Sequence, residues 1–174
     1  NLNRVFLKST NKCKFAVVNL NPKKIVIASP NFLTAEGLRV FFKSNGFVSI
    51  ALVENQDALE RILIKENPDF VLIDDSSSHF KVEKTIAFLS FTKPAQTILL
   101  SNGINQERYD LLNKVGVKYF ISSEITREEL FNLLQCIELD KEFSDHEVKR
   151  RLAFDAEEVF KNTCSELNIS EREV

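Results

Sequence analysis

The chain has 174 residues, 44% of them hydrophobic, which is enough for one hydrophobic core with an appendage but leaves little room for a second complete domain. Its 23 Lys and Arg residues against 25 Asp and Glu residues give a net charge of -2, which argues against a surface built mainly to bind nucleic-acid phosphates. Three widely spaced cysteines match no metal-ligand or disulfide pattern, and no apolar run is long enough to span a bilayer, so we expect a cytoplasmic protein with no membrane partner.

The N-terminal segment, residues 1–22, is predicted to be a solvated basic arm. The first 24 residues contain six Lys and Arg residues and no Asp or Glu. The alternation of apolar residues around Phe15 and Val17 is also compatible with a strand between Lys12 and Leu20.

From residue 24 onward, short β-branched runs alternate with amphipathic stretches of helical spacing. Asn31 is a suitable N-cap for the first helix, and Thr126 with Glu129 makes a capping-box pattern before the fifth. This (βα)5 alternation predicts a doubly wound α/β fold with a parallel sheet, whose functional residues should lie at the carboxyl ends of the strands. The predicted strands are residues 25–28, 48–53, 70–73, 97–100 and 117–121, and the predicted helices are residues 32–44, 57–65, 81–91, 106–114 and 126–137.

The character of the chain changes after Glu138. Residues 139–168 are rich in charge, lack Gly and Pro, and show helical apolar spacing at Val148 and Leu152. We therefore predict a helical linker over this range, following a domain that spans residues 23–138.

The stretch Pro68-Asp-Phe-Val-Leu-Ile-Asp74 resembles the third strand of the receiver domains of two-component response regulators. The resemblance covers about residues 23–138. It includes Glu36-Gly37-Leu38, which is similar to the first helix of the NarL/LuxR family of response regulators in particular. This resemblance implies the flavodoxin-like receiver fold.

The same resemblance assigns positions of the receiver phosphorylation site to residues of this chain. It implies that Asp74 stands at the phosphoacceptor position and Ser101 at that of the hydroxyl that contacts the phosphoryl group. Tyr119 matches the aromatic residue that rotates on activation. The acidic pair that follows the first strand in receivers is replaced here by Ser29 and Pro30.

Two further departures from the receiver pattern follow the third and fifth strands. The lysine position holds Ser122, and Asp74 is followed by Asp75 and three serines. A carboxylate that accepts a phosphoryl group needs a divalent cation and a positive side chain to offset the converging negative charge. We therefore expect poor magnesium affinity, no cofactor and no enzymatic activity. Adjacent strand residues point to opposite faces, so Asp75 could replace a missing ligand only if the strand ended between Asp74 and Asp75.

The end of the chain, Leu167-Asn-Ile-Ser-Glu-Arg-Glu-Val174, resembles the opening of a LuxR-type helix-turn-helix domain. A leucine and a serine N-cap precede an acidic-basic-acidic first turn, about one linker's length after the receiver-like domain. The resemblance implies that residues 169–174 begin a DNA-binding domain whose recognition helix is not in this chain. DNA would then be a partner of the longer protein, and a sensor histidine kinase would be a partner if Asp74 is phosphorylated.

A helix that covers a sheet needs one apolar stripe along its length, and the first and fifth predicted helices carry more apolar surface than this. Large exposed apolar patches are uncommon on monomers, so we predict a homodimer, with coverage by the linker helices as the alternative. The predicted dimer face consists of Phe32, Ala35, Phe42, Phe131 and Leu134. The second apolar stripe of the first helix consists of Leu33, Gly37, Val40 and Phe41.

Three functional hypotheses are compatible with these features. The first is an atypical response regulator, whose receiver-like domain controls or dimerises a DNA-binding transcription regulator without aspartyl phosphorylation. The second keeps the chemistry and makes Asp74 a working phosphoacceptor. The third is a stand-alone protein-interaction module.

Overall fold

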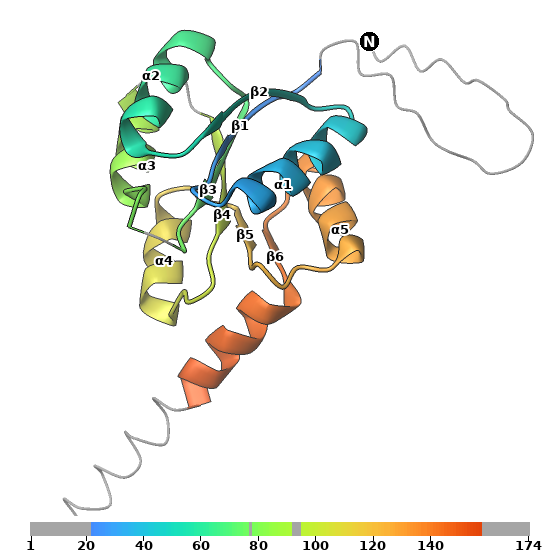
Figure 1. The fold of residues 1–174 in the computed structure, drawn as a ribbon. Helices are drawn as coiled ribbons and strands as arrows, with labels where there is room; N and C mark the ends of the chain where they lie inside the picture. Colours follow the sequence, from blue (N-terminus) through green and yellow to red (C-terminus); the bar gives the residue numbers. More distant parts are fainter. Residues whose placement is uncertain (1–21, 77, 92–94, 158–174) are drawn as a thin grey trace, which may run out of the picture.

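The computed structural model describes residues 22–76, 78–91 and 95–157. At its centre is a six-stranded sheet in which every pair of neighbouring strands runs parallel, in the order β2-β1-β3-β4-β5-β6 (Figure 1). The strands are β1 (Lys24–Ala28), β2 (Val48–Val53), β3 (Phe70–Asp74), β4 (Gln96–Leu100), β5 (Tyr119–Ile121) and β6 (Phe143–Ser144).

Helices cover both faces of the sheet. The core cluster on one face contains residues of α1 and α5, and the cluster on the other contains residues of α2, α3 and α4 (Figure 1). A further helical segment, residues 146–157, follows β6. This arrangement confirms the predicted doubly wound α/β fold. The helices are α1 (Phe32–Ser44), α2 (Gln56–Glu66), α3 (Val82–Phe91), α4 (Gln106–Lys114) and α5 (Arg127–Glu138).

Local sequence signals explain where several helices begin and end. The Asn31 side chain accepts hydrogen bonds from two main-chain amides of α1, and Asn105 accepts one from α4. Thr126 and Glu129 form the predicted capping box of α5. After α1 the chain turns at Gly46, whose φ of 87° lies in the region that favours glycine.

The central strand β3 is buried along its whole length because helices cover it on both sides. Its first four residues are apolar, which is the composition that a doubly covered strand requires. The fifth residue, Asp74, is a buried carboxylate, so its surroundings must supply hydrogen-bond donors.

A sixth strand lies in the range that the sequence pattern predicts to be a helical linker. In β6, Phe143 and Ser144 pair with Tyr119 and Phe120 of β5. The amide of Asp145 then donates to the Phe120 carbonyl at 3.2 Å. A strand of two residues is too short to show a periodic pattern in the sequence. β6 is therefore defined only by its pairing with the edge of β5. The helical part of the predicted linker begins only after it.

Some predictions concern parts of the chain that the structure does not describe. The possible strand in the N-terminal arm and the stretch that resembles a helix-turn-helix opening both lie outside the described residues. The domain limits at residues 23 and 138 remain predictions, although β6 continues the sheet beyond Glu138. No helix within the described ranges is both long and apolar enough to cross a bilayer.

Candidate functional site

The polar residues assigned to a receiver site meet at the carboxyl ends of the strands. Ser29 follows β1, Asp74 ends β3, Ser101 follows β4 and Ser122 follows β5. All four are buried, and Asp75, which follows Asp74, is partly buried. Parallel strands bring their carboxyl ends to one edge of the sheet, and this is the edge where doubly wound folds carry their sites.

Donors from this chain occupy both oxygens of the Asp74 carboxylate. The Ser29 hydroxyl donates to Asp74 Oδ2 at 2.6 Å. On the other side, the Ser76 amide donates to Asp74 Oδ1 at 3.0 Å, and the Ser76 hydroxyl donates to the same oxygen. Asp74 is only 2% exposed, so these bonds replace the water that the buried carboxylate has lost.

Ser29 and Pro30 form the connection between β1 and α1. The Ser29 amide donates to the Val53 carbonyl at 3.0 Å, and the Ser29 hydroxyl oxygen accepts from the Asn31 amide at 3.1 Å. Ser29 therefore links three things: the end of β2, the cap residue of α1 and the Asp74 carboxylate. Pro30 is partly buried and supplies no side-chain ligand.

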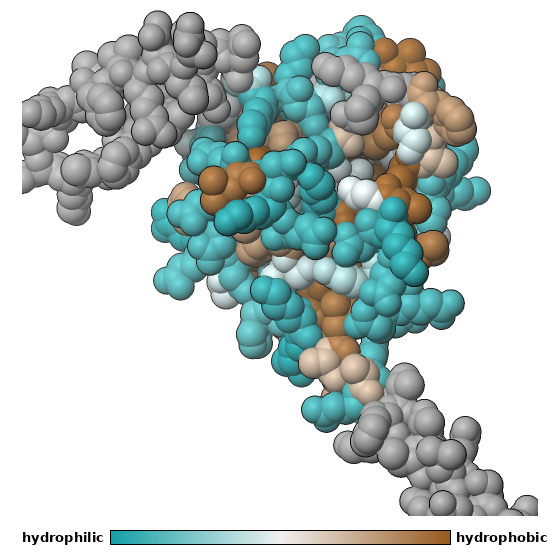
Figure 2. Space-filling model, turned by 180° about the vertical axis from the view of Figure 1, so that it is seen from behind, coloured by the Kyte–Doolittle hydropathy of each residue, from teal (hydrophilic) through white to brown (hydrophobic). Residues whose placement is uncertain are grey.

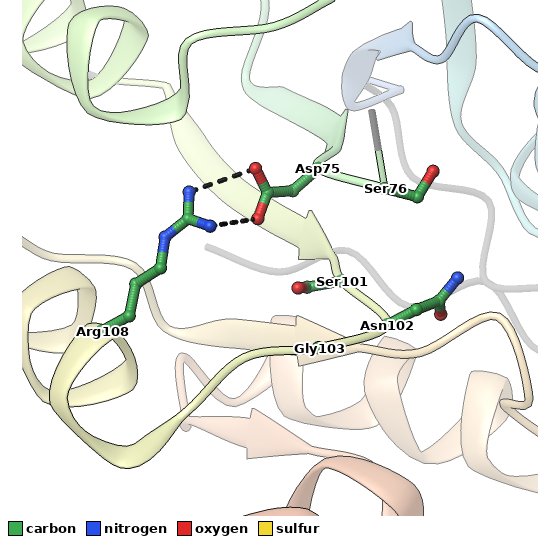
Figure 3. Close-up of a pocket in the computed structure, with 6 residues that line it drawn as sticks. All are labelled: Asp75, Ser76, Ser101, Asn102, Gly103 and Arg108. Atoms are coloured by element: carbon green, nitrogen blue, oxygen red, sulfur yellow. Dashed lines mark hydrogen bonds and ion pairs between the residues drawn. The ribbon is translucent and has the colours of Figure 1, made fainter. Parts of the chain in front are cut away.

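Asp75 is held by Arg108 of α4, a residue that the sequence motifs do not identify. The two guanidinium nitrogens contact the two carboxylate oxygens at 2.8 and 3.1 Å, in the fork geometry typical of arginine and carboxylate (Figure 3). Arg108 also pairs with Glu83 of α3 at 3.0 Å. The carboxylates of Asp74 and Asp75 thus have separate partners, and the structure does not bring them together as one ligand pair.

An open pocket of about 310 Å³ lies beside this ion pair (Figure 3). Burial raises the pKa of Asp75 above its ordinary value, although the Arg108 charge acts in the opposite direction. The pocket is polar and has a charged pair on one wall. Its lining consists of Asp75, Ser76, Ser101, Asn102, Gly103 and Arg108.

Ser122, which the sequence resemblance assigns to the position of the receiver lysine, forms a hydrogen bond with a carboxylate from further along the chain. Its amide donates to Asp145 Oδ2 at 2.5 Å, and its hydroxyl oxygen accepts from the Glu124 amide at 3.2 Å. Asp145 Oδ1 accepts from the Val148 amide at 2.8 Å, so Asp145 also caps the helical segment 146–157. An Asp three residues before an apolar helical residue, as Asp145 is before Val148, is a signal for an N-cap. No sequence pattern, however, connects Asp145 with Ser122.

The structure does not bring Tyr119 to the carboxyl edge. Tyr119 begins β5, is fully buried in the core cluster of α1 and α5, and donates from its hydroxyl to Gln96 Oε1 at 3.2 Å. Gln96 begins β4, so this hydroxyl is at the amino end of the sheet. Burial first, and then the Asp140 charge, raises the pKa of Tyr119 to about 12. The match of Tyr119 to the aromatic residue that rotates on activation therefore remains a prediction, and in this structure its hydroxyl lies at the edge of the sheet opposite Asp74.

The structure also corrects part of the predicted dimer face. Ala35 and Phe42 are buried and pack with Leu38 against the sheet, in the cluster that α1 shares with α5. They form the stripe that covers the sheet, so neither can contact a second copy. Phe32, which the prediction also includes, is 66% exposed.

The outward stripe of α1 is the second apolar stripe of this helix, which the predicted dimer face does not include. Leu33 and Val40 are 79% and 56% exposed. Phe41 contacts Phe131 of α5 with ring centroids 5.5 Å apart, and α1 and α5 lie side by side (Figure 1). Leu134 is partly buried in the same cluster, whereas Phe131 remains exposed. From behind, the surface is mainly hydrophilic with separate hydrophobic patches (Figure 2).

No protein-family model matches the chain, and no curated protein matches it. Solved structures do match. A LuxR-family two-component response regulator from Aurantimonas sp. SI85-9A1 has a TM-score of 0.66 and 14% sequence identity, and the match covers 78% of this chain and 99% of that chain.

Two receiver domains give similar results. The isolated REC domain of RcsB from Salmonella enterica serovar Typhimurium, in the presence of the phosphomimetic BeF3-, has a TM-score of 0.66 and 16% identity, over 76% of this chain and 99% of that one. The receiver domain of the response regulator NarL from Mycobacterium tuberculosis has a TM-score of 0.58 and 19% identity, over 67% of this chain and 96% of that one. The fold of this chain is therefore the fold of response-regulator receiver domains of the LuxR and NarL type.

Proposed function

We propose that this chain is the receiver-like domain of an atypical LuxR- or NarL-type response regulator and controls or dimerises a DNA-binding domain without aspartyl phosphorylation. The observation that carries the proposal is the occupation of both Asp74 oxygens by Ser29 and Ser76. Phosphoryl transfer to a carboxylate requires a cation and a positive side chain close to it. The lysine position holds Ser122, whose amide is bound to Asp145.

The donor set around Asp74 does not fit magnesium, the metal that the receiver fold implies. Magnesium takes oxygen ligands in near-octahedral geometry and depends on carboxylate charge to offset its loss of water. Ser29 and Pro30 occupy the positions of the acidic pair, and Asp75 is in an ion pair with Arg108. Within the ranges that the structure describes, no three His, Cys, Asp or Glu side chains converge as metal ligands. We infer that magnesium affinity is poor and that the proposed function does not use the metal.

Incubation of the purified chain with acetyl phosphate and magnesium tests this proposal. We expect intact-mass spectra of the parent and of Asp74→Asn to show the same low level of phosphorylation. A receiver that retains the acidic pair and the lysine serves as the positive control under the same conditions. Stoichiometric labelling that is lost in Asp74→Asn would contradict the proposal. It would favour the second hypothesis, with Asp74 as phosphoacceptor and a sensor histidine kinase as partner.

The DNA-binding part of the proposal is supported by the C-terminal resemblance and by one further match. The structure of an RcsB–DNA complex has a TM-score of 0.66 and 16% identity, and the match covers 76% of this chain but 68% of that chain. We expect a protein that continues past Val174 by one small helical domain to bind a two-part DNA site in preference to random competitor DNA. Equal binding to both would favour the protein-interaction module instead.

A further inference from the structure

The helical segment 146–157 is anchored at its base by Asp145. One oxygen of this carboxylate accepts from the Ser122 amide at 2.5 Å, and the other accepts from the Val148 amide at 2.8 Å. Asp145 is 1% exposed, so both bonds are shielded from water, which strengthens them. The Val148 side chain is buried in the core cluster of α2, α3 and α4. The first turn of the segment is therefore part of the domain.

A second polar contact joins the segment to the loop after β4. The Arg151 guanidinium donates to the main-chain carbonyl of Asn102, and it pairs with Glu147 at 2.6 Å. Asn102 lines the pocket beside Asp75. Its side-chain oxygen also accepts from the Ser123 amide at 2.9 Å, so the same residue holds the loop after β5.

These contacts connect the pocket with the segment that leaves the domain. Figure 1 shows the helical segment, in orange-red, projecting away from the carboxyl end of the sheet. Asp145 fixes its base, and Arg151, about one and two-thirds turns later, braces it against the Asn102 loop. The brace depends on the position of the Asn102 loop, whereas the base is held by the main-chain amides of Ser122 and Val148.

We propose that Asp145 and Arg151 form a latch that couples the Asn102 loop to the direction in which the helical segment leaves the domain. The inference deepens the proposed function, on which it rests, because in that function the segment leads toward the DNA-binding domain. Movement of the loop beside the pocket is the event that opens the latch. Neither contact of the latch is made to Asp74, because the partners are main-chain groups of Ser122 and Asn102.

Hydrogen exchange measured by mass spectrometry on the whole chain tests the latch. Arg151→Ala should accelerate the exchange of amides 149–157 by about fivefold to tenfold, because a charge-assisted hydrogen bond is lost and short undocked helices are marginal in water. Arg150→Ala is the matched control. Arg150 also pairs with Glu147, at 2.7 Å, but among the described residues Arg151 is the arginine that reaches Asn102.

Asn102→Ala tests the coupling from the other side. It removes the bond to the Ser123 amide and loosens the loop, so amides 149–157 should again exchange faster while those of β3 and β4 do not change. Faster exchange in β3 and β4 of Arg151→Ala would mean that the substitution loosens the whole domain. In that case Arg151→Lys is the test variant, because lysine keeps the positive charge beside Glu147 but lacks the forked guanidinium group. The latch is disproved if amides 149–157 exchange alike in the parent and the Arg151 variant, or alike in the Arg150 and Arg151 variants.

The exchange experiment contains neither DNA nor phosphate, so its outcome is separate from that of the proposed function. If amides 149–157 exchange faster in the Arg151 variant but the longer protein shows no DNA preference, the latch is supported and the proposed regulator function is rejected. If amides 149–157 exchange at the parent's rate in the Arg151 variant but the longer protein binds DNA selectively, the latch is rejected and the proposed regulator function is supported.

Discussion

At the scale of single residues, Ser29 determines the surroundings of the Asp74 carboxylate. A second carboxylate beside Asp74 would repel it unless a cation lay between them. A serine hydroxyl instead donates a hydrogen bond to Asp74 Oδ2, at 2.6 Å, which offsets part of the cost of burying the carboxylate. Through Ser29 and Ser76, the Asp74 carboxylate ties the β1–α1 and β3–α3 loops together.

A double-mutant cycle measures the strength of this tie. Ser29→Ala and Asp74→Ala should show a coupling energy of about 2 kcal/mol in urea unfolding. Each single variant already removes the buried hydrogen bond between the two side chains, so the double variant does not lose it a second time. Ser123→Ala, at an exposed serine, should leave the free energy of unfolding nearly unchanged. Additive effects of Ser29→Ala and Asp74→Ala, within about 0.5 kcal/mol, would show that Ser29 does not hold Asp74.

At the scale of one element, the helical segment 146–157 carries its own acid-sensitive pair. Glu147 accepts hydrogen bonds from Arg150 and then Arg151, which lower its pKa from the ordinary value of 4.5 to about 2. The unfolded chain therefore binds more protons than the folded chain between these two values. The contribution of Glu147 to stability is complete above pH 4.5 and is lost as the pH falls toward about 2.

Unfolding at several acidic pH values checks this contribution. The unfolding midpoint of the parent in urea should fall more steeply between about pH 5 and about pH 3 than that of Glu147→Gln, which cannot release a proton there. Glu157→Gln, at an exposed glutamate of the same segment, should follow the parent. Parallel curves for the parent and Glu147→Gln would mean that the two arginines do not favour the ionised form of Glu147.

At the scale of the whole molecule, the apolar surface left exposed on α1 and α5 determines how two copies could meet. Leu33 and Val40 lie on the outward stripe of α1, and Phe131 lies exposed on α5 beside Phe41. Phe42, by contrast, is fully buried. A homodimer through these helices, which remains our prediction, would therefore use the outward stripe.

Sedimentation velocity of the parent and of charged variants tests this dimer. We expect a dimer for the parent and a folded monomer for Val40→Glu, because an unpaired carboxylate buried in an interface costs several kcal/mol. Phe42→Glu should unfold the chain, since it places a charge in the core. Ile64→Glu, on an exposed position of α2, should leave the dimer intact. A parent that sediments as a monomer at high concentration would exclude the α1–α5 dimer.

The candidate site was predictable in its location but only partly in its contacts. The end of each apolar strand is visible in the sequence, so the apolar runs alone place Asp74, Ser101 and Ser122 at one edge of the sheet. The partners of these residues were not predictable in this way. Arg108 lies 33 positions after Asp75, and Asp145 lies 23 positions after Ser122, so no local pattern relates them. The packing of α4 against the sheet brings Arg108 to Asp75, and the pairing of β6 with β5 brings Asp145 to Ser122.

By itself, the sequence determined the α/β alternation, the parallel sheet and the helix starts at Asn31 and Thr126, because periodicity and capping are local properties of the chain. The tertiary structure decided which stripe of α1 is buried. Both stripes are apolar, and the packing of α1 against the sheet buries Ala35 and Phe42. It also decided that a two-residue β6 exists, because that strand is defined only by the main-chain groups that the edge of β5 offers it.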